Sequence, residues 1–331
     1  MYIVSSYFMA IMLCVITMLC WGSWANTQKL AQKSWRFEFF YWDYVIGIVL
    51  MSLLFSLTMG STGEQGRGFI EDISQAEMSN IGNALLGGII FNAANILVVA
   101  AIAIAGMSVA FPIGIGIALV LGVIINYFAA PQGNAAWLFA GVGLVTVAIV
   151  IDAMAYRKKA SQSHKVSGRG IMLSVVGGVL MALFYRFVAS SMVTNFEQPE
   201  AGLMTPYTAV FIFSLGVLLS NFVFNTMLMR KPFEGTPVTY SQYFEGSLKE
   251  HMTGILGGFI WCVGMTFNII AAGKAGFAIS YGLGQGATLV AALWGVFIWK
   301  EFKGVKGVSM HLAAMFLLFF IGIGMIVYAG M

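Results

Sequence analysis

A chain of 331 residues in which 60% of the side chains are hydrophobic and only 9% are charged does not fit a soluble globular protein, where about a quarter of the residues are charged. With a mean hydropathy of +0.88, this composition predicts an integral membrane protein. The net charge of +4 is then explained by the orientation of the chain across the membrane, and it gives no reason to expect a nucleic-acid partner. No basic start with a small-residue cleavage site follows Met1, so we expect no signal peptide.

Ten apolar runs are long enough to cross the hydrocarbon core, for which a helix needs about 20 residues. We therefore predict an all-α integral membrane protein with ten transmembrane helices surrounded by lipid. The runs cover residues 6–27, 39–60, 81–104, 108–129, 135–154, 170–192, 205–228, 252–272, 276–298 and 309–329. Most of the connections are short, and the two longest polar loops are residues 61–80 and 156–170.

The lysines and arginines are distributed unevenly between the two sides of the membrane. All but three of them follow the first, fifth, seventh or ninth run, and the exceptions are Arg67, Lys274 and Arg186. Positively charged loops stay on the cytoplasmic side. We therefore predict that both termini face outside, together with the acidic loop of residues 61–80.

Two long segments of the chain resemble each other. Residues 86–129 align with residues 256–299 without a gap, so that Leu86-Gly87-Gly88 falls on Leu256-Gly257-Gly258. A weaker similarity links AIMLC near residue 10 to GIMLS near residue 170. The chain is thus predicted to contain two five-helix repeats, residues 1–155 and 170–331, joined by a basic cytoplasmic linker at residues 156–169. An odd number of spans per repeat makes this a 5+5 inverted repeat, which is common in transporters.

The duplicated segments are rich in small residues. Residues 282–287, GLGQGA, satisfy the glycine fingerprint of a dinucleotide-binding loop, but such a loop follows a strand and opens a soluble helix. Small residues at i, i+4 spacing instead form a ridge that lets two transmembrane helices approach closely. The two predicted ridges are Ala110, Gly114, Ala118 and Gly122, and Ser280, Gly284, Thr288 and Ala292.

Three short motifs carry a resemblance to a known group of transporters. They are MLCWGSWANTQKL at residues 18–30, YWDY at residues 41–44 and SVAFPIGIGIALVLG at residues 108–122. With the ten spans and the repeat, they resemble the drug/metabolite transporter superfamily, and within it the ureide permeases and the glucose/ribose porters (GRP sugar transporters). The third motif is similar to the fourth span of rhamnose–proton symporters.

This resemblance implies uptake of sugars or ureide-like nitrogen compounds across the cytoplasmic membrane by alternating access. The plant ureide permeases carry a phosphate-loop-like motif in the central cytoplasmic loop. The corresponding loop here, YRKKASQSHKVSGRG at residues 156–170, has no such motif. We therefore expect no use of ATP and no cofactor.

Charged residues inside the spans are the first candidates for function, because they are costly in hydrocarbon and tend to face the bundle interior. Arg186 would bind substrate oxygens there, or it would extend to the outer interface. Asp43 is either an ordinary boundary residue or a proton-coupling carboxylate, whose pKa is set by burial and neighbours; we take it as the coupling candidate. Asp152, beside Arg157 at the end of its span, is expected to be solvated.

Amide and aromatic side chains provide the predicted substrate site. Asn92 and Asn95 share a helix face, amides both donate and accept hydrogen bonds, and aromatic faces suit a sugar or a flat heterocycle. The alternative for each amide is a hydrogen bond between helices. The predicted substrate-binding residues are Trp24, Asn26, Asn92, Asn95, Arg186, Trp261, Asn268, Tyr281 and Gln285.

Our leading hypothesis is a secondary active importer of a small polar metabolite. A monosaccharide is the first choice and a ureide or nucleobase-like compound the alternative, coupled to protons or to sodium. Efflux of amphipathic drugs and a passive channel or receptor remain open. We do not expect an enzyme, because the spans contain no paired carboxylates or histidine cluster. We also expect no metal site and no disulfide, because Cys14, Cys20 and Cys262 lie in apolar runs.

Overall fold

The structure is a computed structural model that describes residues 1–31, 35–105, 107–159, 168–233 and 235–331. Within these ranges the chain is helical, and its only β pairing is an isolated bridge between Met192 and Met204. The helices are α1 (Tyr7–Ser23), α2 (Ala25–Ala31), α3 (Phe37–Leu57), α4 (Phe69–Gln75), α5 (Met78–Ala105), α6 (Met107–Ala129), α7 (Ala135–Lys159), α8 (Gly168–Ser190), α9 (Pro206–Arg230), α10 (Tyr240–Phe244), α11 (Leu248–Ala275), α12 (Phe277–Gly284), α13 (Ala287–Leu293), the π-helix η1 (Trp294–Ile298) and α14 (Ser309–Tyr328).

Ten helical segments are long and apolar enough to cross a membrane in the part of the chain that the structure describes. The first span, Tyr7–Ala31, combines α1 and α2, and the ninth, Phe277–Ile298, combines α12, α13 and η1. The predicted all-α fold with ten spans is confirmed. The glycine-rich residues 282–287 lie inside the ninth span, as expected for a transmembrane segment and unlike a nucleotide-binding loop.

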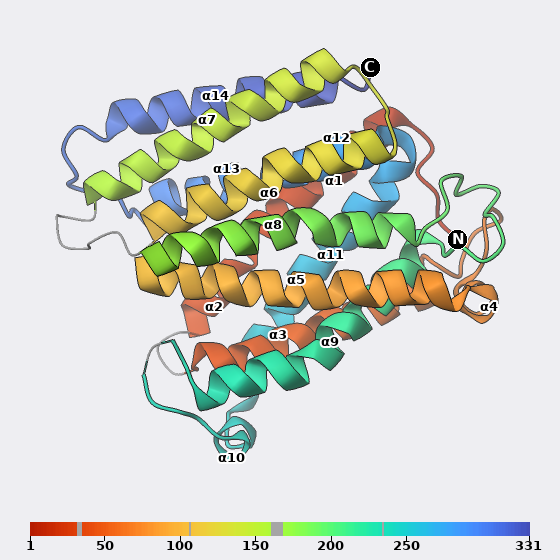
Figure 1. Cartoon of the computed structure of the whole chain (residues 1–331), viewed down its shortest axis with the longest axis horizontal. Helices are drawn as coiled ribbons and strands as arrows, with labels where there is room; N and C mark the ends of the chain where they lie inside the picture. Colours follow the sequence, from red (N-terminus) through yellow and green to blue (C-terminus); the bar gives the residue numbers. More distant parts are fainter. Residues whose placement is uncertain (32–34, 106, 160–167, 234) are drawn as a thin grey trace.

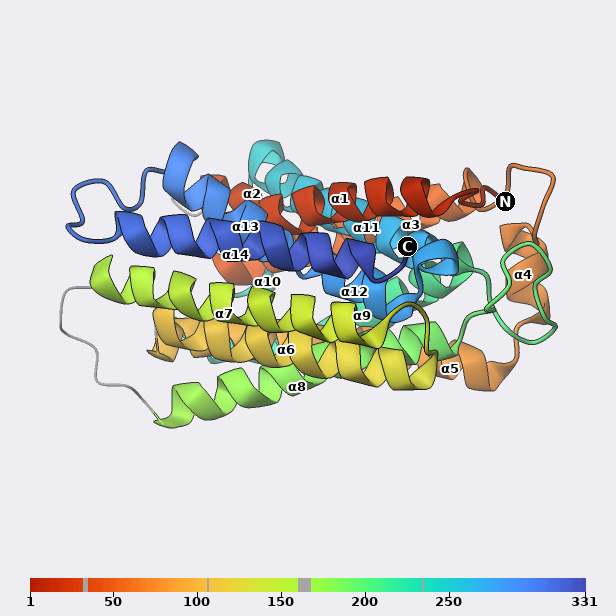
Figure 2. The ribbon, with the colours of Figure 1, turned by 90° about the horizontal axis from the view of Figure 1, so that it is seen from above.

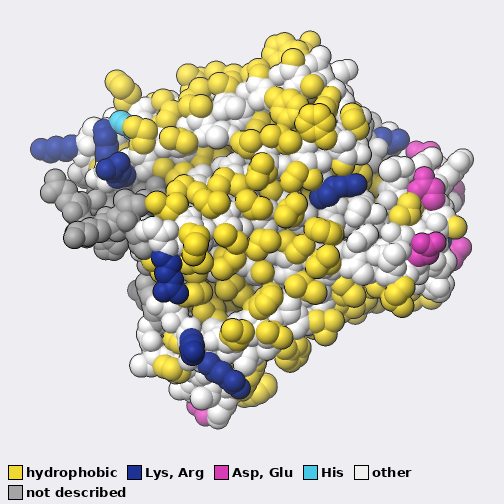
Figure 3. All heavy atoms as spheres, viewed as in Figure 1, with side chains coloured by type: hydrophobic (Ala, Val, Ile, Leu, Met, Phe, Trp, Pro, Cys, Tyr) yellow, Lys and Arg dark blue, Asp and Glu magenta, His cyan; other side chains and the backbone are white. Residues whose placement is uncertain are grey.

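The spans form one bundle along the long axis of the molecule. The pair α7 and α14 lies on one side and α3 with α9 on the other, and α5, α8 and α11 lie between them (Figure 1). Both termini lie at the same end as α4, as a second view also shows (Figure 2), whereas α10 lies at the other end. Lysine and arginine side chains gather toward the α10 end of the visible face, and acidic side chains toward the α4 end (Figure 3). We call these the basic end and the acidic end.

Two helix crossings in the bundle are closed by glycines in the same way. Where α5 crosses α9, a Cβ on Gly88 would lie 2.1 Å from the carbonyl oxygen of Phe213, and a Cβ on Gly216 2.1 Å from that of Leu85. No side chain fits at such distances, so the two backbones touch. Close backbone approach through small residues is the usual way for transmembrane helices to gain packing energy.

The crossing of α3 and α11 repeats this arrangement. A Cβ on Gly258 would lie 2.0 Å from the carbonyl oxygen of Tyr44, and a Cβ on Gly47 2.3 Å from that of Ile255. Gly88 and Gly258 are partners in the alignment of residues 86–129 with 256–299. The similarity between these segments therefore extends to their backbone contacts.

The predicted small ridges also lie at close contacts. A Cβ on Gly122 would lie 2.2 Å from Cε1 of Tyr281, and one on Gly284 would lie 2.8 Å from Cζ3 of Trp21. The expectation that these glycines allow close packing is confirmed at both positions. Their close neighbours are side chains from other helices, Tyr281 at Gly122 and Trp21 with Asn268 at Gly284.

We expect Gly258→Ala to destabilise the protein, because the new methyl group forces α3 and α11 apart. Overpacking of this kind typically costs about 1–3 kcal/mol. The matched control is Gly143→Ala on α7, where a Cβ meets nothing within 4 Å. Thermal unfolding of the purified protein in detergent compares the two variants, and equal melting temperatures would contradict the contact described above.

Candidate functional site

Aromatic side chains from four spans meet in the middle of the bundle. Trp261 on α11 is buried; its ring stacks on Trp21 at a centroid distance of 5.9 Å, and Phe91 lies 4.5 Å away. Trp24 follows α1 at the point where the helix is interrupted before α2, and its ring lies 4.7 Å from that of Tyr44. We call Trp21, Trp24, Tyr44, Phe91 and Trp261 the central aromatic cluster.

Polar groups adjoin this cluster on one side. The Tyr41 hydroxyl donates a hydrogen bond to Oδ1 of Asn92 at 2.8 Å and accepts one from Nδ2 of Asn95 at 3.1 Å. The Tyr44 hydroxyl, one turn further along α3, is fully buried and has no hydrogen-bond partner among the described residues. A buried hydroxyl normally finds a partner, so Tyr44 offers an unused donor and acceptor to a molecule that enters the cluster.

The ninth span is irregular next to the cluster. Between α12 and α13 the backbone bonds are of the tighter i−3 type, from Gly286 N to Leu283 O at 2.8 Å and from Leu289 N to Gly286 O at 3.0 Å. Such tightening inside a helix often marks a functional hinge, and interrupted spans at the midplane form many transporter sites. Gln285 lies in this turn and is largely buried.

Asn268 connects this turn to the cluster. Its Nδ2 donates to the carbonyl oxygen of Ser280 at 2.7 Å, while its Oδ1 has no partner in the described part of the chain. A Cβ on Gly284 would lie 2.9 Å from Asn268 Nδ2 and 2.8 Å from the ring of Trp21. Asn268 and the Gln285 turn therefore flank the cluster on the side of Trp21.

The structure brings together five of the predicted substrate-binding residues. Trp24 and Trp261 belong to the central aromatic cluster, Asn95 and Asn268 border it, and Gln285 directly follows Gly284, which packs against Trp21. The list of predicted substrate-binding residues does not include Tyr41, Tyr44 or Trp21. The motif YWDY contained the signal for the tyrosines, but a run of aromatic residues at a helix start is also typical of the membrane interface.

Three other predicted residues mainly connect helices. Asn92 donates to Ser220 Oγ on α9 at 2.9 Å, and the Tyr281 hydroxyl donates to Ala118 O at 3.1 Å. Asn26 accepts a hydrogen bond from Trp299 Nε1 at 2.7 Å near the basic end. These contacts match the alternative considered for the amides, and a direct role in substrate binding stays a prediction.

Arg186 lies away from the cluster. It is half-buried on α8, and no described residue forms an ion pair or hydrogen bond with it. By helical periodicity it shares a face with Val175, which is exposed on the outside of the bundle. This position fits the alternative of a side chain that extends along the membrane surface better than it fits a ligand-binding role.

Asp43 is held by three donors at the basic end of the bundle. Its carboxylate accepts hydrogen bonds from Trp35 Nε1 at 2.9 Å and Tyr243 Oη at 2.7 Å, and His251 Nδ1 lies 2.8 Å from Oδ1. Burial is the largest cause that raises the pKa of the Tyr243 hydroxyl well above its usual value. The hydrogen bond to Asp43 and the charge of Asp43 raise this pKa further. Asp43 with Trp35, Tyr243 and His251 is called the Asp43 cluster below.

An ion-pair network also lies at the basic end. Glu301 accepts from Lys29 Nζ at 2.7 Å and from Lys159 Nζ at 3.1 Å. Partial burial acts to raise the pKa of the Glu301 carboxyl, but its hydrogen bonds to the two lysines and their charges hold the pKa below its usual value. The network connects the ends of the first and fifth spans to the turn after the ninth.

Asp152 is not solvated, contrary to our expectation. It is 7% exposed, and its Oδ1 atom is buried without a hydrogen-bond partner among the described residues. Its neighbour in sequence, Arg157, suggested a solvated helix end, but Asp152 lies on the inner face of α7. No group of three or more potential metal ligands comes together in the described ranges.

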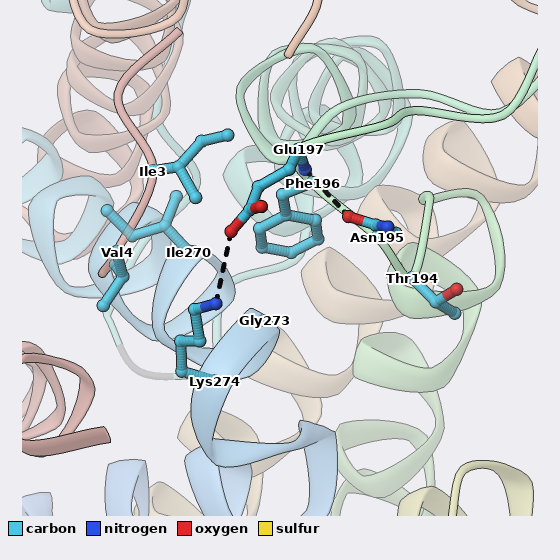
Figure 4. A pocket seen from close by; sticks show the side chains of 9 residues that line it. All are labelled: Ile3, Val4, Thr194, Asn195, Phe196, Glu197, Ile270, Gly273 and Lys274. Carbon is cyan, nitrogen blue, oxygen red and sulfur yellow. Dashed lines mark hydrogen bonds and ion pairs between the residues drawn. The ribbon is translucent and has the colours of Figure 1, made fainter. Parts of the chain in front are cut away.

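A cavity of about 210 Å³ opens at the acidic end. It lies between the N-terminal segment, the α8–α9 loop and the end of α11, and Lys274 Nζ reaches Glu197 Oε1 across it at 3.3 Å (Figure 4). Beside this pair the ring of Phe196 packs on Gly273, where a Cβ would lie 2.6 Å from Cε2. This cavity is thus lined by one exposed ion pair and one aromatic ring.

Comparison with known proteins places the chain in a family. A family model described as ureide permease matches residues 40–169 and 157–329. Ureide permease 1 of Arabidopsis thaliana is 22% identical over 379 residues, covering 97% of this chain and 96% of the relative, and Ureide permease 2 is 22% identical over 368 residues, covering 92% of each. A solved structure described only as "Crystal structure of protein" has a TM-score of 0.61 at 14% identity, covering 96% of this chain and 95% of that one; this likeness concerns the fold alone. The chain belongs to the ureide permease family and is a multi-pass membrane transporter of small molecules.

Proposed function

We propose that this protein transports a ureide, or a related flat heterocycle with amide groups, and that the central aromatic cluster is its substrate site. The curated relatives are named as ureide permeases. They favour the ureide alternative, and nothing in their names supports the monosaccharide that we preferred from sequence. The aromatic rings would contact the faces of such a heterocycle, and its N–H and C=O groups would pair with hydroxyls and amides at the edge of the cluster.

The observation that carries this proposal is the unpaired hydroxyl of Tyr44. It is buried and has no partner among the described residues. The ring that carries it lies 4.7 Å from the ring of Trp24 and 6.5 Å from that of Trp261. Ligand sites are mostly apolar with a few well-placed polar groups. Asn268, whose Oδ1 is buried without a partner among the described residues, provides a second such group near Trp21, since both side chains lie close to Gly284.

We further propose that the halves 1–155 and 170–331, with the linker 156–169, are an inverted repeat that rocks about this site. The equivalent glycine crossings of α5 with α9 and of α11 with α3 support the repeat. The excess of lysine and arginine at one end supports a cytoplasmic basic end with both termini outside, and a location in the cytoplasmic membrane. Access from that end would require the Lys29–Glu301–Lys159 network to open.

Coupling to protons remains part of the proposal, with sodium as the alternative ion. For Asp43 we propose a structural role in place of the predicted coupling role, because Trp35, Tyr243 and His251 all hydrogen-bond to its carboxylate and hold it in position. Efflux of amphipathic cations is less well supported, because no carboxylate lies among the described residues of the aromatic cluster.

Counterflow in proteoliposomes tests the substrate class. The purified protein is preloaded with unlabelled allantoin, uracil or a monosaccharide, and entry of the labelled compound is followed without an imposed gradient. We expect counterflow of allantoin or uracil and none of the sugar. Trp261→Ala, which removes the ring at the centre of the cluster, should abolish it. Counterflow of the monosaccharide alone, or of no compound in the panel, would refute the proposed substrate class.

A further inference from the structure

The buried carboxylate of Asp152 has no role in the site described above. It lies on α7, one turn before Tyr156, and its Oδ1 atom is buried without a hydrogen-bond partner among the described residues. An ionised carboxylate that is buried without a partner is strongly unfavourable, and such a group usually neutralises by taking up a proton. The carboxylate of Asp43, by contrast, has three hydrogen-bond partners.

The surroundings of Asp152 contain a second carboxylate with its own partners. Glu301 is close enough to Asp152 for their charges to interact, but both of its oxygens are engaged by Lys29 and Lys159. Tyr156 and Glu301 meet beside Gly295, where a Cβ would lie 3.1 Å from the Tyr156 hydroxyl and 3.8 Å from Cδ of Glu301.

The other helices packed on α7 contribute few titratable groups. On α14 the only charged or basic residue is His311, whose Nδ1 is buried and has no partner among the described residues. The helix α6 contains no acidic or basic residue at all. On α7 itself, Arg157 and Lys158 follow Asp152, and Lys158 donates to the carbonyl oxygen of Gly307.

The ninth span connects the surroundings of Asp152, at the basic end, with the proposed substrate site. Gly295 belongs to η1, a π-helical turn in the ninth span, and such turns are frequent at functional sites. The same span contains the Gln285 turn beside the central aromatic cluster. A change of charge at Asp152 therefore acts on the end of the span that also borders the site.

We propose that Asp152 is the proton-binding residue of this transporter and that its protonation controls the Lys29–Glu301–Lys159 network. With a proton on Asp152, only Glu301 is negative and both lysines pair with it, so the basic end stays closed. When the proton leaves, Asp152 competes with Glu301 for the lysines and the network loosens. This inference rests on the proposed transport function and moves the coupling role from Asp43 to Asp152.

The test compares two transport modes in proteoliposomes for Asp152→Asn. A fixed neutral side chain should permit counterflow, which needs no net proton movement, but it should abolish accumulation driven by an imposed proton gradient. Asp152→Glu is the matched control and should retain both. Two outcomes would overturn the assignment. One is accumulation of substrate by Asp152→Asn at the wild-type level. The other is a wild-type protein that performs counterflow but does not accumulate substrate when the proton gradient is imposed.

A measurement on the unmodified protein covers the case in which Asp152→Asn does not fold. Hydrophobic carbodiimides react with protonated carboxyl groups, and mass spectrometry locates the adduct. We expect labelling of Asp152 that falls as the pH rises. Absence of label on Asp152 at low pH refutes the proposal. If wild-type protein shows no counterflow of any compound while Asp152 is labelled as expected, the proposed substrate class fails and the proton site stands.

Discussion

Removal of the Tyr44 hydroxyl is expected to weaken substrate binding without weakening the fold. In Tyr44→Phe no hydrogen bond within the protein is lost, because the described residues give this hydroxyl none. If the substrate is its partner, binding loses one buried hydrogen bond, about 1.4 kcal/mol or roughly tenfold in the dissociation constant. Binding of labelled allantoin or uracil by the detergent-purified protein and its melting temperature give the two readouts.

Tyr41→Phe is the matched control for this experiment. It removes the same atom one turn away on α3, but here the hydroxyl bonds Asn92 and Asn95. Two buried amides then lose a partner, and we expect the free energy of unfolding to fall by about 1–3 kcal/mol. If Tyr44→Phe binds substrate as tightly as the wild type, the central aromatic cluster is packing only. If it lowers stability as much as Tyr41→Phe, its hydroxyl has a structural partner.

The fold was predictable because it depends on length and hydropathy. Ten apolar runs gave ten spans, and small residues at helical spacing marked where helices approach, as at Gly122 and Gly284. It was harder to predict which face of each helix lies in the interior of the bundle. In a span that is apolar all round, such as α7, hydropathy does not distinguish the lipid-facing side from the interior, so the burial of Asp152 had no signal in the sequence.

Prediction was right about which residues of one helix share a face. Asn92 and Asn95, three residues apart, both reach Tyr41. Prediction failed for partners distant in the chain. His251 and Tyr243 reach Asp43 from about 200 positions away, and neither stands in a motif. Contacts of this kind depend on how the spans pack, which periodicity within one span does not encode.

Loss of the Asp43 carboxylate is expected to be among the most destabilising single changes in the protein. In Asp43→Ala the donors of Trp35, Tyr243 and His251 lose their common acceptor in a buried place. A buried donor that loses its acceptor typically costs about 1–3 kcal/mol, and here several donors lose theirs at once. Asp43→Asn keeps one acceptor oxygen and should cost less, whereas Glu245→Ala, at an exposed acidic residue beside the cluster, should change the melting temperature little.

The same variants separate a structural role of Asp43 from a coupling role. If the Asp43 cluster fastens α10 and the start of α11 to α3, Asp43→Asn lowers the melting temperature, and the folded fraction still accumulates substrate on a proton gradient. Accumulation, corrected for folded protein, is the decisive measurement. If Asp43→Asn is as stable as the wild type and has lost only gradient-driven accumulation, the carboxylate carries the coupling proton despite its three donors, and the assignment to Asp152 is wrong.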